Sequence, residues 1–314
     1  MLMEDPNDHS VDEALALTHT GVFIHRRDHV IVPTIVDAYA DDKRHHALVY
    51  HWLDGDWSQH LVEDSICGVV ATGDSPVEVL NVGVNGTVVV AKIPGGESTE
   101  SVDPTARGPN YSETLRCVRK IGPSIYVAGM ARQVYRRDGL GRWVAVDAGT
   151  YLARGQRHQA VGFLDIDGDS DGRLYAVGYK GEIWIREADA WTQEPSPTSV
   201  ALTKVLGTSS GDVVICGLAG VILRGTKGRW QVLAEDATRE DFWGLAEYLG
   251  EIYLATDRRL FKLVGNTLQP VDFGSPRPLS TSYLHSADGV LWSVGPKDIV
   301  FTDNGTDWHL VPNP

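Results

Sequence analysis

An acidic stretch in the middle of the chain, DIDGDSDG, has residue types and spacing that could bind a calcium ion. Asp167, Asp169, Asp171 and Gly172 match the start of a calcium-binding loop, because alternate carboxylates converge on one centre and the glycine permits a sharp turn. The twelfth position of such a loop is Gly178 rather than glutamate, and Asp and Gly also favour ordinary hairpin turns. Two interpretations stay open: an acidic turn and a calcium site. No other cofactor is indicated.

Histidines are the second group of residues that could do chemistry, and eight of the eleven lie within the first 60 residues. His25 and His29 have helical spacing in a stretch typical of a strand, and the neighbours His45 and His46 would point to opposite faces of a strand. This pattern predicts scattered surface histidines rather than a metal site, with a charge that varies near pH 6.

The three cysteines, Cys67, Cys117 and Cys216, form no CxxC pair. They indicate neither a disulfide framework nor a thiolate zinc site, and a reducing cytoplasm is the simplest compartment. The acidic segment 1–16 lacks the basic and apolar regions of a secretory signal, and no apolar run is long enough to cross a membrane.

These residues are set in a repeat with a period near 39. A β-rich run ends in a small residue, and a second run, a polar turn and often a Trp follow. The small residues fall at 129, 178, 217, 256 and 295, and the closing apolar residues at 143, 191, 230, 268 and 308. Weaker copies lie upstream, around VLNVG and ALVYHWLDGDW. Each unit has room for four short antiparallel strands, which is the signature of a propeller blade.

The sequence therefore predicts an all-β, seven-bladed propeller of four-stranded antiparallel blades. It occupies residues 17–314 after an acidic segment 1–16, with blades of about 17–64, 65–114, 115–159, 160–202, 203–241, 242–279 and 280–314. The small residue is expected where the inner strands crowd the axis, and the Trp is expected to pack between blades. The first unit can supply all of its own strands, so we expect the ring to close by side-chain packing without a shared strand.

The YxVGxxGxIxR…GxW pattern of residues 115–314 resembles the BNR/Asp-box-like and photosystem-assembly-factor-like seven-bladed propellers, of the wider WD40/YVTN-like repeat class. Asp303, Gly305 and Trp308 resemble a degenerate Asp box, in which Phe301 replaces the usual serine. The resemblance implies architecture and says little about function, because propellers have many unrelated activities.

Nucleotide-binding motifs are missing, since the sequence contains no GxxxxGK[ST] or GxGxxG. GxSxG occurs twice, as GDSDG at 168–172 and GTSSG at 207–211, but both matches fall in turns between predicted strands and lack the strand-to-helix context of a nucleophile elbow. A glycan- or small-molecule-acting enzyme, such as a sialidase-like hydrolase or a lyase, would need arginines, a tyrosine and carboxylates converging at the propeller axis. This is the alternative to a non-enzymatic binding scaffold, which the sequence favours.

Binding in propellers commonly uses the loops that link blades and the turns between second and third strands. Arg, Tyr and Trp, which are enriched at binding hot spots, are frequent in these loops. The predicted binding-face residues are Tyr151, Arg154, Arg157, His158, Tyr179, Lys180, Arg239, Trp243, Arg258, Arg259 and Arg277.

Charge is distributed unevenly. The formal net charge is −14, and residues 1–114 contain 19 Asp/Glu but only 6 Lys/Arg. This excess weighs against nucleic-acid binding and favours a basic protein partner. Asp37, Asp41 and Asp42 are the predicted acidic patch, in a segment expected to be an exposed loop. The favoured function is protein binding in the cytoplasm, either as an immunity protein that neutralises a basic toxin or as an assembly factor, with no nucleic acid and no membrane involved.

Overall fold

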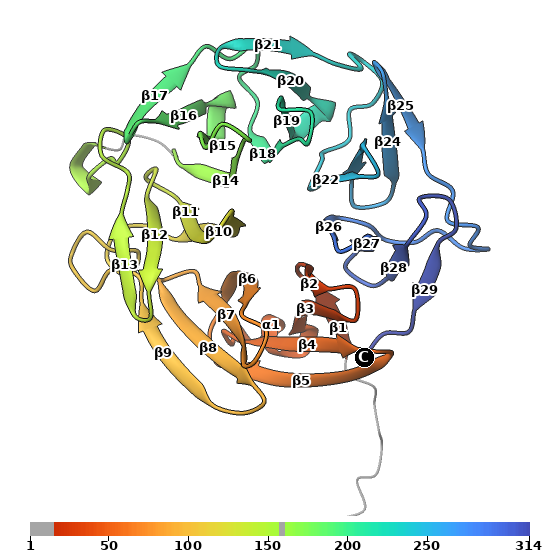
Figure 1. The fold of residues 1–314 in the computed structure, drawn as a ribbon, viewed down its shortest axis with the longest axis horizontal. Helices are drawn as coiled ribbons and strands as arrows, with labels where there is room; N and C mark the ends of the chain where they lie inside the picture. Colours follow the sequence, from red (N-terminus) through yellow and green to blue (C-terminus); the bar gives the residue numbers. More distant parts are fainter. Residues whose placement is uncertain (1–15, 157–160) are drawn as a thin grey trace, which may run out of the picture.

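Short runs of Val, Ile, Leu and Tyr, separated by Gly- and Asp-containing turns, fold into antiparallel sheets. The computed structural model describes residues 16–156 and 161–314. Seven sheets surround one central axis, and each sheet is formed by consecutive segments of the chain (Figure 1). The predicted seven-bladed, all-β propeller is confirmed.

The strand bounds follow the repeat from blade to blade. Blade 1 contains β1 Leu17–His19, β2 Phe23–Arg26, β3 His29–Val36, α1 Asp37–Asp41, β4 Ala47–Leu53 and β5 Asp56–Val62. Blade 2 contains β6 Ile66–Thr72, β7 Val77–Gly83, β8 Thr87–Ile93 and β9 Glu97–Ser101. Blade 3 contains β10 Leu115–Ile121, β11 Ser124–Gly129, β12 Val134–Gly139 and β13 Arg142–Ala145, followed by the short helix η1 Arg154–Gln156.

Blade 4 contains β14 Phe163–Gly168, β15 Leu174–Gly178, η2 Tyr179–Gly181, β16 Ile183–Glu187 and β17 Ala190–Glu194. Blade 5 contains β18 Leu202–Gly207, β19 Val213–Gly217, η3 Leu218–Gly220, β20 Ile222–Thr226 and β21 Arg229–Val232. Blade 6 contains β22 Gly244–Tyr248, β23 Glu251–Ala255, β24 Leu260–Val264 and β25 Thr267–Pro270. Blade 7 contains β26 Tyr283–Ala287, β27 Val290–Val294, β28 Ile299–Thr302 and β29 His309–Val311.

Blade 1 departs from the four-stranded pattern. Both β1 and β2 pair with β3, so its innermost strand is interrupted at residues 20–22. Pro33 lies opposite this interruption and has no backbone N–H to donate, although its carbonyl accepts from the Thr20 amide at 2.8 Å. The break therefore has a local cause in the sequence of β3.

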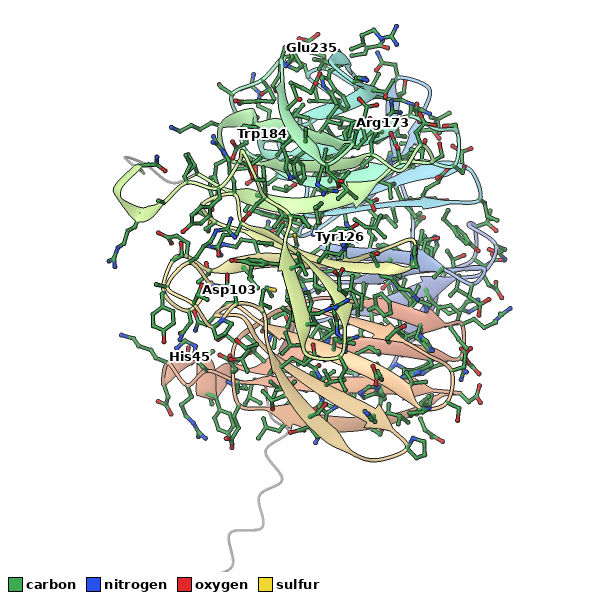
Figure 2. The ribbon with its side chains drawn as sticks, turned by 60° about the vertical axis from the view of Figure 1, so that its left-hand side comes forward. His45, Asp103, Tyr126, Arg173, Trp184 and Glu235 are labelled. Atoms are coloured by element: carbon green, nitrogen blue, oxygen red, sulfur yellow. The ribbon has the colours of Figure 1, made fainter. Side chains whose placement is uncertain are left out.

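The antiparallel order of each blade gives the propeller two different faces. The loops that link consecutive blades and the turns between second and third strands form one face, which we call the linker face. The other turns form the hairpin face. In the side view of Figure 2, the labelled His45 and Asp103 lie toward the linker face and Arg173 toward the hairpin face.

The small residue at the end of the second strand has a steric cause that differs from the expected one. A Cβ added to Gly178 would overlap the carbonyl of Gly162, and one added to Gly217 would overlap the carbonyl of Ala201. These carbonyls precede the innermost strand of the same blade. The requirement for glycine therefore comes from contact with that strand rather than from crowding around the axis.

The repeated Trp packs between neighbouring blades, as predicted. Trp191 stacks on Phe163 with ring centroids 5.9 Å apart, and its Nε1 donates to the Val146 carbonyl at 2.7 Å. Trp230 meets Tyr175 edge to face. The contact with Phe163 lies within blade 4, whereas the contacts with Val146 and Tyr175 each join a blade to the one before it.

The ring closes between blades 7 and 1 without a shared strand in the described chain, as the sequence indicated. Trp52 contacts Trp292 edge to face at 5.2 Å between ring centroids, and Trp57 Nε1 donates to the Pro312 carbonyl at 2.9 Å. One main-chain hydrogen bond, from the His19 amide to the Pro296 carbonyl at 3.0 Å, adds to the packing.

Candidate binding face and axial cavity

The described members of the predicted binding face share the linker face, because all of them lie in blade-linking loops or in turns between second and third strands. Arg157 and His158 lie outside the described residues. The remaining positions are Tyr151, Arg154, Tyr179, Lys180, Arg239, Trp243, Arg258, Arg259 and Arg277. Whether they bind a partner stays a prediction.

Several of these residues are held by other parts of the face. Arg259 forms an ion pair with Glu240, and Arg277 Nη2 lies 2.6 Å from Asp298 Oδ1. Trp243 has no such restraint on its outer surface and keeps 40% of its area exposed. The face therefore combines paired arginines with an exposed aromatic ring near the axis.

Sequence reasoning missed part of the face, in the loop between blades 2 and 3. Arg107 forms an ion pair with the buried Asp147, and its guanidinium lies over the Tyr151 ring at 4.4 Å from the centroid. Tyr111 in the same loop is 58% exposed. The signal was the loop's position between two blades, but the weak repeat in this region obscured it.

The predicted acidic patch lies on the same face, since α1 occupies the turn between the second and third strands of blade 1. Asp41 and Asp42 are exposed. Asp37 is half-buried, and its carboxylate accepts from Lys297 Nζ and from Thr18 Oγ1, each at 2.6 Å. These hydrogen bonds lower the pKa of Asp37. Asp37 therefore joins blade 1 to blade 7, and the segment contains a short helix where an exposed loop was expected.

The carboxylates of the DIDGDSDG loop are occupied by protein donors. Arg173 Nε lies 2.6 Å from Asp169 Oδ2, and Arg173 Nη2 lies 2.6 Å from Asp171 Oδ2. Asp167 accepts from the Gly207 amide at 3.1 Å, and burial raises its pKa. Within residues 16–156 and 161–314, no group of three or more His, Cys, Asp or Glu side chains could hold a metal ion.

The prediction of scattered surface histidines is wrong for blade 1. His29 and His51 are 1% and 3% exposed, because alternate positions of β3, β4 and β5 face blade 2. His29 Nε2 lies 3.0 Å from His51 Nδ1, and His51 Nε2 lies 3.1 Å from His60 Nδ1. Asn81 of blade 2 continues the chain, with its Nδ2 3.2 Å from His60 Nε2. We call these four side chains the imidazole relay.

The direction of the imidazole relay follows from Asn81. Its amide nitrogen also donates to the Val89 carbonyl at 3.0 Å, so it donates to His60 Nε2 as well. His60 then donates through Nδ1 to His51, and His51 through Nδ1 to His29. Each imidazole is neutral in this arrangement. Burial and, to a smaller extent, the neighbouring histidines lower the pKa of His51 to about 3. Burial, with smaller contributions from His25 and Arg26, lowers the pKa of His29 to about 4. The expected titration near pH 6 is therefore wrong for these two.

A cavity of about 410 Å³ lies on the propeller axis and is lined by residues from all seven blades. Its ionisable lining includes Arg116, Arg119, Lys120, Lys204 and Asp165. Asp165 Oδ2 accepts from Arg119 Nη2 at 2.8 Å and from the Val205 amide at 3.1 Å. Such an arrangement can attract an anion, and none of the predicted binding residues except Trp243 lines it.

The geometry defines the class of the molecule as a seven-bladed β-propeller with one loop-rich face and a cationic axial cavity. Among solved structures, YCF48 bound to D1 peptide is similar, with a TM-score of 0.68, 17% identity and 92% of each chain covered. YCF48 from Cyanidioschyzon merolae has a TM-score of 0.66 at 12% identity and covers 92% of this chain and 95% of its own. The WD40 β-propeller domain of Doa1 has a TM-score of 0.69 at 10% identity, with coverages of 93% and 95%.

No protein-family model matches the sequence. The immune protein Tsi7 of Pseudomonas aeruginosa is 32% identical over 305 residues, which are 93% of this chain and 96% of that protein. The chain therefore belongs to the family of the immune protein Tsi7. This relationship supports the predicted immunity role. The similarity to YCF48, at 17% identity, shows the fold alone. No helix in the described parts of the chain is long and apolar enough to cross a membrane.

Proposed function

We propose that this protein is an immunity protein that binds a basic protein toxin through its linker face and thereby neutralises it. The observation that carries the proposal is the 32% identity to an immune protein across 93% of the chain. The partner's positive charge is part of the proposal and is supported by the concentration of acidic residues in the first third of the sequence.

The linker face supports the proposal because it brings two kinds of contact together. The exposed Asp41 and Asp42 of blade 1 can steer a basic partner, since charges at the rim of an interface act mainly on the association rate. Trp243 and the loop arginines lie on the same face and can provide the central anchors. We place the complex in the cytoplasm, where a reducing environment suits the three free cysteines.

The test is co-expression with the product of the neighbouring reading frame. If that product is toxic, this protein should restore growth and should co-elute with the toxin in gel filtration. A toxic product that kills cells despite abundant folded propeller, and that does not co-elute with it, would contradict the proposal.

Charge steering has a matched control within blade 1. The double substitution Asp41→Asn and Asp42→Asn on the linker face should slow association with the toxin and flatten its salt dependence. Asp54→Asn with Asp56→Asn removes the same charge from exposed positions in a turn of the hairpin face, and should leave the association rate unchanged. Equal effects of the two double variants would show that the linker face is not the docking surface.

A further inference from the structure

The axial cavity has the opposite charge from the protein that surrounds it. The chain has a formal net charge of −14, yet the cavity lining contains Arg116, Arg119, Lys120 and Lys204 against the single carboxylate of Asp165. These cations come from the innermost strands of blades 3 and 5. Like charges that line one cavity repel each other, and a bound anion relieves this repulsion.

Arg116 and Lys204 are the two cations available to a ligand at the linker-face end of the cavity. Arg119 is already paired with Asp165, whereas in the described chain neither Arg116 nor Lys204 has a carboxylate within 4.0 Å. Both lie near the beginning of an innermost strand, β10 for Arg116 and β18 for Lys204. This is the end that opens toward the blade-linking loops.

The entrance to the cavity is built for an organic ligand. A second pocket of about 410 Å³ shares Arg116, Lys204, Trp243 and Tyr283 with the axial cavity, so the two are continuous. The aromatic rings of Trp243 and Tyr283 come from blades 6 and 7 and supply apolar walls beside the two cations. Asp257 adds one carboxylate at this entrance, and it lies 3.7 Å from Arg258 Nε.

His285 in the cavity wall adds a neutral donor. Its Nδ1 accepts from the Ile24 amide at 3.2 Å, which leaves Nε2 as the protonated nitrogen. Burial and the charge of Arg119 lower the pKa of His285 to about 3, so the ring is neutral near pH 7. The depressed pKa agrees with a positive potential inside the cavity.

We propose that the axial cavity is a binding site for a small organic anion with carboxylate or phosphate groups, which are held by Arg116 and Lys204 while its carbon skeleton lies against Trp243 and Tyr283. The volume is within the range of small-molecule sites in proteins. The anionic group can belong to a free small molecule or to an acidic side chain of a bound protein. The inference does not depend on the proposed immunity function.

The test is calorimetry at low ionic strength with three probes: citrate, inorganic phosphate and a short glutamate peptide. Wild-type protein should bind at least one of them. Binding of citrate or phosphate identifies a free small anion as the ligand, and binding of the peptide alone identifies an acidic side chain. Absence of binding by all three at millimolar concentration would overturn the proposal.

The variant Arg116→Gln with Lys204→Gln should weaken binding of the active probe about tenfold or more, because each charge-assisted hydrogen bond contributes that order of affinity. The control is Lys43→Gln with Arg44→Gln, which also removes one lysine and one arginine from exposed positions of the linker face, outside the cavity and its entrance. It should change affinity less than about twofold. Equal losses in both variants would show unspecific attraction to the face and would overturn the proposal.

If the axial variant does not fold, anomalous scattering from wild-type crystals soaked in bromide decides instead. A bromide peak between Arg116 and Lys204 is expected, and its absence would refute the site.

Discussion

The interfaces between blades 1 and 2 and between blades 5 and 6 join their sheets with different chemistry. At the 5–6 interface a buried apolar cluster contains Val214 and Ile222 of blade 5. In the same cluster Phe242 and Phe261 of blade 6 meet edge to face at 6.3 Å between ring centroids. At the 1–2 interface the imidazole relay of His29, His51, His60 and Asn81 lies beside an apolar cluster that contains Val49 and Val79. The comparison teaches that a regular repeat is not required for a stable interface, but that a polar interface stabilises only while its hydrogen bonds are satisfied.

The largest effect is expected at the apolar interface. Phe242→Ala should lower the free energy of unfolding by about 3–5 kcal/mol, because the side chain is fully buried and a cavity would remain. Urea unfolding at pH 7.5 and at pH 5 should give the same loss, since the Phe242 side chain carries no titratable group. A loss that depends strongly on pH would remove the distinction between the two interfaces.

The imidazole relay should make the stability of the wild-type protein depend on pH. The unfolded histidines take up protons near pH 6.5, whereas burial keeps His29 and His51 neutral until about pH 4 and 3 in the folded protein. The relay therefore contributes its full stability above pH 6.5, and this stability is lost as the pH falls from 6.5 toward 3. One unit of pKa shift corresponds to about 1.4 kcal/mol, so the free energy of unfolding should fall by a few kcal/mol across this range.

The variant His51→Phe isolates this effect. At pH 7.5 it should cost about 1–3 kcal/mol, because His29 Nε2 and His60 Nδ1 each lose the hydrogen bond to His51. Below pH 6.5 its stability should fall less steeply than that of the wild type, since one depressed pKa has been removed. Parallel pH profiles for the two proteins would show that other buried histidines with a lowered pKa, such as His19 and His285, control the acid sensitivity.

The contrast between the two interfaces also explains how far the sequence could predict the structure. The spacing of Gly178, Gly217 and Gly295 predicted the blades because the same steric contact with the backbone before the innermost strand requires glycine in blades 4, 5 and 7. The imidazole relay could not be predicted in this way, since it depends on which face of β3 turns toward blade 2. A single sequence does not show that His29, His51 and His60 share that face until the strand register is known.

The candidate sites divide in the same way. The loops of the linker face follow from blade topology, so the sequence could place Trp243 and Arg259 there. The axial cavity could not be foreseen, because Arg116 and Lys204 are 88 positions apart and line one cavity only when the closed ring brings the innermost strands of blades 3 and 5 to the axis. Local pattern therefore predicts which face a residue occupies, whereas contacts across the axis need the closed ring.

A smaller effect is expected at the closing interface between blades 7 and 1. Asp37→Asn removes the ion pair between Asp37 and Lys297, whose side chains are 34% and 53% exposed, respectively. Because the pair is largely solvated, its loss should lower the free energy of unfolding by about 0.2–1 kcal/mol. The free energy of unfolding from urea titration checks this, with Asp41→Asn as a control that removes an exposed charge without such a partner. A cost above that range would mean that the ion pair, rather than the packing of Trp52 on Trp292, holds the ring closed.

The smallest effect is expected at the acidic turn between β14 and β15 of blade 4. This turn adds ionised groups to the comparison of neutral and apolar ones. Arg173 already binds Asp169 and Asp171, so a calcium ion would have to displace a guanidinium that makes two contacts of 2.6 Å. We therefore expect the melting temperature of the wild-type protein to be unchanged at millimolar Ca²⁺, because an ion stabilises the fold only as far as it binds. Arg173→Gln removes this competitor, and a rise in melting temperature with Ca²⁺ in that variant alone would show that the arginine occupies a calcium-like loop. A rise already in the wild-type protein would contradict the acidic-turn interpretation and establish the loop as a calcium site.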